Sequence, residues 1–244
     1  VAPRPVIAGR GIAPPEGLVH PANSAAGSKQ MPFQQDRDSG ARELVEAVNA
    51  EAGELVNLLR CSQAPDNVLA EATEHIRAAM ESLAPYLKQG EGWSTISIAS
   101  DTPGVGWMED DLTRCMPYSP VSGRRNPVAP PIRMWRDGDE VRGEAVFSPT
   151  YAGPPNSVHG GIIAAVFDEL LSMANVISGS AGFTGTLTIK YLRHTPLDRP
   201  IELWAVNERS SGRKQFSRGE MRVDGQVTAS AEGLFIRPAS QTDA

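Results

Sequence analysis

Residues 153–161 have the sequence Gly-Pro-Pro-Asn-Ser-Val-His-Gly-Gly and lead directly into an apolar run with helical spacing. A helix that begins near His159 and Gly160 leaves its first backbone N–H groups without partners, with the positive end of the helix dipole behind them. Glycines allow a substrate oxygen to approach these N–H groups, because they carry no β-carbon. The segment is therefore suited to stabilising a developing oxyanion.

The helix that follows carries Asp168 on its less apolar side. At about 100° per residue, the large apolar side chains fill about half of the circumference; they are Ile162, Ile163, Val166, Phe167, Leu170, Leu171, Met173 and Ile177. Asp168 falls opposite them, beside Ala164, Ser172 and Asn175, whereas Glu169 lies nearer the edge and is expected to be solvated. Small neighbours indicate that a ligand or a partner chain packs against Asp168; simple exposure is the alternative.

The spacing between His159 and Asp168 limits what one helix can do. At a rise of about 1.5 Å per residue, Asp168 lies about 13 Å from His159 along the axis. One carboxylate so placed cannot easily serve a carbonyl bound at the amino terminus of the same helix. A second helix running antiparallel beside the first could supply it. The spacing therefore predicts a site shared between two protomers.

The elements that must position these residues form an α+β plan, with one central helix followed by an antiparallel meander. Strand-like segments lie on both sides of the predicted helix at 159–178, namely 131–137 and 140–147 before it, and 184–193, 200–208, 213–223 and 226–236 after it. The last of them alternates clearly between apolar and polar residues. Asp137-Gly138-Asp139 and Asp224-Gly225 are typical of hairpin turns.

Composition divides the rest of the chain. Residues 1–35 are rich in Pro, Ala, Gly and Ser and predict a flexible arm, and residues 91–114 predict a linker. Between them, residues 36–90 contain two amphipathic helices at 38–60 and 66–88. These helices could form a regulatory or partner-binding element or a packing extension, and we favour the extension.

Several classes of protein are disfavoured. A net charge of −6 argues against a nucleic-acid binder. Cys61 and Cys115 are the only cysteines, so a disulfide framework or a structural zinc site is not expected. We find neither a secretion signal nor an apolar run of about 18 residues, so we expect no membrane span and a cytoplasmic location.

His-Gly-Gly followed by an Asp nine positions after the His, within Tyr151-Ala-Gly-Pro-Pro-Asn-Ser-Val-His-Gly-Gly, resembles the hotdog-fold acyl-CoA thioesterases. The similarity is to the PaaI-like enzymes and to those related to the carboxyl-terminal modulator protein. It runs from about Arg133 to Arg237 and includes Thr184, Ile189-Lys-Tyr-Leu-Arg-His-Thr-Pro-Leu and Ser211-Gly-Arg-Lys. The helices at 38–60 and 66–88 match no motif of that family.

The resemblance implies a hotdog domain at 115–238, in which an antiparallel sheet wraps one long helix. It implies a homodimer or homotetramer with its sites at the interface between chains. Asp168 matches the catalytic carboxylate, acting as general base or nucleophile. The Gly160 N–H matches the oxyanion donor, His159 shapes the turn, and Thr184 orients the carboxylate or water. Such chemistry requires no metal and no cofactor.

Candidate substrate contacts come from the turn before the helix and, independently of the resemblance, from the charge distribution. Gly161 and Asn156 lie in the turn, although the spacing of Asn156 leaves its role open. Residues 184–222 hold 8 basic and 4 acidic side chains, against 6 and 15 in residues 36–115. Within that basic stretch, the side chains expected to hold the phosphates of coenzyme A are Lys190, Arg193, Arg213 and Lys214. Ordinary solvated strand faces are the alternative for each.

Hydrolysis of acyl-CoA thioesters is therefore the expected activity. A non-catalytic acyl-CoA binder or scaffold is one alternative, because the helical extension could serve partners. A hotdog hydratase or dehydratase is the other, although those enzymes usually show a different helix signature with a catalytic His and Asp.

Overall fold

The computed structural model describes residues 39–87 and 111–238. The expected arm at 1–35 and nearly all of the expected linker at 91–114 lie outside the described residues.

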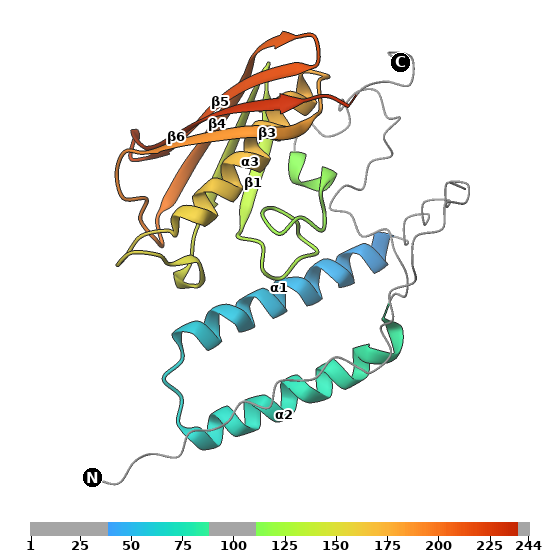
Figure 1. Ribbon diagram of the computed structural model, residues 1–244. Coiled ribbons are helices and arrows are strands. Elements are labelled where there is room, and N and C mark those ends of the chain that lie inside the picture. The colour runs from blue at the N-terminus through green and yellow to red at the C-terminus, as the bar shows by residue number, and fades with distance from the viewer. Residues whose placement is uncertain (1–38, 88–110, 239–244) are drawn as a thin grey trace, which may run out of the picture. The chain divides into compact units, whose positions relative to one another are not determined.

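Six antiparallel strands form one sheet around a single long helix (Figure 1). The strands are β1 (Ile132–Asp137), β2 (Glu140–Val146), β3 (Phe183–Tyr191), β4 (Pro200–Ser211), β5 (Lys214–Val223) and β6 (Gln226–Ile236), and the helix is α3 (Gly160–Ile177). Their order in the sheet is β1-β2-β4-β5-β6-β3, so β3 forms one edge. The expected α+β hotdog architecture is confirmed.

The sheet buries every second residue against α3, as the alternation in the sequence predicts. The largest fully buried side chains include Phe167, Leu170 and Leu171 from the helix, which form one core cluster with side chains from the strands. The predicted hairpin turns form at Gly138 and at Asp224-Gly225, all with positive φ. The apolar arc of α3 is therefore what the sheet wraps.

The helical wheel predicts that Asn175 lies beside Asp168 on the less apolar side of the helix, but the structure buries it. It is fully buried, and its Oδ1 accepts hydrogen bonds from Asn207 Nδ2 at 2.7 Å and from Ser217 Oγ at 2.5 Å. Asn207 lies on β4, which continues to Ser211 and so beyond the predicted end at 208. The long β4 and β5 strands therefore cover this face of the helix at its carboxyl end, while Asp168 stays partly exposed.

Two further helices precede the sheet, α1 (Ser39–Cys61) and α2 (Asp66–Leu83). The second ends earlier than predicted, and Ala84–Tyr86 forms a 3-10 turn, because Pro85 has no N–H to continue the helical bonding. No residue of α2 is buried among the described residues, and its side chains at Leu69 and Met80 are 41% and 56% exposed.

Among the described residues, α3 is the one helix that is long and apolar enough to cross a membrane by length and composition alone, although it carries Asp168 and Glu169. Half of that helix is buried within the protein. Its apolar character is accounted for by its place at the centre of the sheet.

Candidate functional site

The amino terminus of α3 presents one free backbone donor. His159 occupies the N-cap position, and its Nδ1 accepts a hydrogen bond from the Gly161 N–H at 2.9 Å. Among the described residues nothing accepts from the Gly160 N–H. The cap thus satisfies the second N–H of the helix and leaves the first available to a ligand.

The residues before the helix form a tight turn, which accounts for the glycine at 153. A β-carbon at Gly153 would lie 2.6 Å from His159 Cα, so only glycine fits there. Asn156 has a φ of 55° and its carbonyl accepts from the Leu197 N–H at 3.2 Å. The segment 194–197 braces the turn from the other side, where His194 Nδ1 lies 3.1 Å from Ser157 Oγ. The described contacts of Asn156 are those of a turn residue.

Asp168 is held by a hydroxyl from the edge strand. Thr184 Oγ1 donates to Asp168 Oδ1 at 2.6 Å. The register of β3 against β6 shifts between Thr184 and Thr186, which leaves Gly185 as an extra residue. Such a bulge moves the side chains on one side of it to the opposite face of the sheet. Thr184 therefore lies opposite the buried Phe235 and faces α3.

The other end of β3 contacts the other end of the site. Tyr191 Oη donates to the Gly160 carbonyl at 2.9 Å. Edge strand β3 and helix α3 thus run in opposite directions, with Thr184 beside Asp168 and Tyr191 beside Gly160. Sequence reasoning assigned no role to Tyr191, although this residue lies within the segment Ile189-Lys-Tyr-Leu-Arg-His-Thr-Pro-Leu that resembles the thioesterases.

The helical wheel predicts that Glu169 is solvated, but the structure shows it hydrogen-bonded and largely buried. Its two carboxylate oxygens accept hydrogen bonds from Ser119 Oγ and Ser122 Oγ. Burial raises the pKa of Glu169, the two serine hydroxyls oppose that shift, and the nearby charge of Asp168 adds to it. Glu169 therefore links the loop that precedes β1 to the helix through hydrogen bonds. It does so at the position next to the candidate catalytic carboxylate, Asp168.

The four basic residues expected to bind phosphate do not meet within one chain. Lys190 and Arg193 lie at the Tyr191 end of β3, where Lys190 pairs with Glu232 at 3.7 Å. Arg213 and Lys214 lie at the other end, because Lys214 and Phe183 both pair with Ile236. Each end of the edge strand carries its own basic group.

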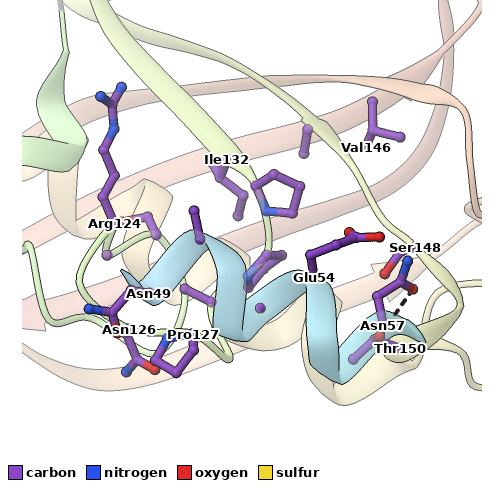
Figure 2. Close-up of a pocket in the computed structure, with 18 of the residues that line it drawn as sticks. Asn49, Glu54, Asn57, Arg124, Asn126, Pro127, Ile132, Val146, Ser148 and Thr150 are labelled. Carbon is purple, nitrogen blue, oxygen red and sulfur yellow. Dashed lines mark hydrogen bonds between the residues drawn. The ribbon is translucent and has the colours of Figure 1, made fainter. Parts of the chain in front are cut away.

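A cavity of about 900 Å³ lies elsewhere, between α1, the segment 122–133 and the end of β2 (Figure 2). At its rim Thr150 Oγ1 lies 3.3 Å from Asn57 Oδ1. Its lining includes neither Asp168 nor Gly160, so it is separate from the candidate site. Within residues 39–87 and 111–238, no cluster of His, Cys, Asp and Glu has the arrangement of a metal site.

No family model matches the chain. The acyl-coenzyme A thioesterase THEM4 of Xenopus laevis is 31% identical over 91 residues, which are 36% of this chain and 41% of that protein. The chain thus spans less than half the length of that curated relative.

Two solved structures are also similar. The crystal structure of a thioesterase superfamily protein is 31% identical, with a TM-score of 0.65, and the match covers 79% of this chain and 94% of that one. Zebrafish thioesterase superfamily member 2 is 17% identical, with a TM-score of 0.46, over 52% of this chain and 94% of that one. A match to 79% of 244 residues is more than the 134 residues from 111 to 244 can supply. The first structure therefore also matches residues that precede 111.

The raised pKa of Glu169 predicts how stability depends on pH. Between the ordinary value of 4.5 and the raised value, the folded state holds the proton that the unfolded state has lost, so stability falls as pH rises through this window. In Glu169→Gln an amide can accept from one serine and donate to the other, and we expect this fall to disappear. Urea unfolding of both proteins across this pH range measures the difference.

Glu81→Gln, at an exposed position on α2, is the control and should retain the fall seen in the unchanged protein. If stability instead rises with pH across the window relative to Glu169→Gln, the serine hydrogen bonds outweigh burial and the assignment is wrong.

Proposed function

The chain belongs to the thioesterase superfamily, and on that premise we propose that it hydrolyses acyl-CoA thioesters to a free acid and CoA. The observation that carries the proposal is one helix with a free N–H at Gly160 and a hydroxyl-held carboxylate at Asp168, beside an open sheet edge. These are the two groups that water attack on a thioester requires. The similarity to an acyl-coenzyme A thioesterase supports CoA as the thiol.

In the proposed mechanism the thioester carbonyl oxygen accepts the Gly160 N–H. Asp168 takes a proton from a water molecule as that water attacks the carbonyl carbon, and the developing oxyanion is stabilised at the helix amino terminus. The tetrahedral intermediate then collapses, the C–S bond breaks, and the CoA thiolate recovers the proton. Thr184 donates to one carboxylate oxygen and leaves the other free for the water.

Direct attack by Asp168 is the variant of this mechanism that the residues also allow. It would form an acyl anhydride on the carboxylate and release CoA before water enters. Both forms use the same two groups, so the geometry that follows applies to each.

We propose that each site is completed by a second copy of the chain. Edge strand β3 is exposed along nearly all of its length, and Phe183 is 74% exposed. Antiparallel pairing of two such strands about Leu187, the middle residue of Phe183–Tyr191, sets Phe183 opposite the partner's Tyr191. The Asp168 end of one chain then lies beside the Gly160 end of the other.

The same pairing would assemble the basic residues. Arg213 and Lys214 lie at the Phe183 end of the strand and would come close to Lys190 and Arg193 of the partner subunit. Two separate groups in one chain would thereby form one cationic surface beside each site. This supports recognition of a phosphate-bearing thiol such as CoA. A homodimer, or a homotetramer built from two such dimers, is the expected assembly.

The first test of this function is the exchange Asp168→Asn. It keeps the shape of the side chain and removes the base, so we expect CoA release to fall at least about a hundredfold while the fold is kept. Release is measured with a thiol reagent over a panel of acyl-CoAs. Asp139→Asn, in the exposed β1–β2 turn, is the matched control and should keep full activity.

Near-normal turnover in Asp168→Asn would exclude Asp168 as the base or nucleophile. Binding of acyl-CoA to the unchanged protein without release of CoA would identify a non-catalytic binder instead.

The second test is complementation in mixed dimers. An Asp168→Asn chain is combined with a Gly160→Pro chain, in which the proline deletes the N–H at a position where helices tolerate it. Each parent homodimer should be inactive, because both of its sites carry the defect. A verified mixed dimer should contain one site with both groups intact and recover about half of the activity of the unchanged dimer. Absence of recovery, or a stable and active monomer, would overturn the shared site.

A further inference from the structure

We infer that Tyr191 is a positioning residue that holds the oxyanion donor at Gly160 in place. The inference rests on the proposed function, because it concerns how that donor is aimed. Tyr191 lies at the end of β3 and faces α3, and its hydroxyl donates to the Gly160 carbonyl at 2.9 Å. Its ring also packs beside Gly160, since a β-carbon built there would lie 3.5 Å from the ring atoms.

Tyr191 and His159 hold the two sides of one peptide group. The carbonyl of Gly160 and the N–H of Gly161 belong to the same planar unit. Tyr191 donates to that carbonyl, and His159 Nδ1 accepts from that N–H at 2.9 Å. The first peptide of the helix is therefore fixed on both sides, and its orientation sets the direction of the preceding Gly160 N–H.

The sequence at this position makes such a clamp necessary. Two consecutive glycines have the greatest backbone freedom and a poor tendency to form helix. They are needed here because a substrate oxygen must approach the backbone closely. An oxyanion donor, however, must be held within about 0.5 Å of its productive position. The hydrogen bond from Tyr191 therefore restricts the backbone conformation that the two glycines leave free.

Strand β3 thereby positions both the carboxylate and the oxyanion donor of the proposed reaction. Thr184 fixes Asp168 at one end and Tyr191 fixes Gly160 at the other. In a dimer paired through this strand, these two ends belong to different sites. Loss of the Tyr191 hydroxyl should then weaken the site that uses the Gly160 N–H of the same chain and leave the other site untouched.

The exchange Tyr191→Phe keeps the ring and deletes the hydroxyl. We expect kcat for CoA release to fall about fivefold to tenfold, as for one lost hydrogen bond, with KM within about twofold. The melting temperature should change little, because the exchange keeps the ring and removes only one hydrogen bond. Tyr191→Ala, which also loses the ring contact, should be slower still, and Tyr86→Phe at an 85% exposed position should behave as the unchanged protein.

A second readout does not depend on turnover. Amide hydrogen exchange at Gly161 should accelerate several-fold in Tyr191→Phe, while exchange at Phe167 in the middle of the helix stays the same. If the unchanged protein releases no CoA, the proposed function fails, and the exchange of Gly161 still decides whether the clamp exists. Unchanged exchange together with unchanged kcat would overturn the inference, and so would a rise in KM at constant kcat.

Mixed dimers decide through which group Tyr191 acts. When a Tyr191→Phe chain is combined with an Asp168→Asn chain, one site takes Gly160 with its own Tyr191 from the second chain and Asp168 from the first. That site should turn over at the full rate of an unchanged site. When Tyr191→Phe is combined with Gly160→Pro, the single working site should keep the slow rate of Tyr191→Phe. The opposite pattern, with a slow site in the first mixture and a full-rate site in the second, would assign Tyr191 to Asp168 and contradict the inference.

Discussion

A straight helix cannot bring its first residue and its ninth residue to the same atom, and the arrangement of the candidate site depends on this constraint. Gly160 carries the free N–H and Asp168 the held carboxylate, and they lie about 12 Å apart along the axis of α3. The sheet wraps the apolar side of that helix and leaves the stretch around Asp168 partly open. In the proposed function, this stretch is covered by the Gly160 end of a second chain.

Edge strand β3 contacts both chemical groups of α3, one at each of its ends. It runs antiparallel to α3 and spans the same interval, so its two ends lie beside the two chemical groups. The bulge at Gly185 aims Thr184 at the helix, although the strand alternation beyond the bulge would place that residue on the outer face. Pairing of two such strands would bring unlike ends together. Strand β3 would then hold Asp168 and Gly160 within each chain, and would also determine how the two chains align.

The sequence predicted what depends on local pattern. Alternating burial located β5 and β6, helical periodicity located α3, and the clustered glycines marked its amino terminus. It did not reveal what depends on contacts between distant segments. Tyr191 bonds to a residue 31 positions away, and the serine at 119 bonds to Glu169 across 50 positions. The burial of Asn175 also escaped prediction, because a helical wheel contains no information on how far β4 and β5 extend past it.

The most direct test of a thioesterase site shared between two chains is a crystal structure with an acyl-CoA analogue in which a methylene group replaces the thioester sulfur. Such an analogue keeps the carbonyl and cannot be hydrolysed. The proposed site predicts that its oxygen lies about 2.7–3.1 Å from the Gly160 nitrogen of one chain. The carboxylate of Asp168 from the other chain should face the carbonyl carbon with room for one water. A carbonyl bound away from Gly160, or contacted by both groups of a single chain, would contradict it.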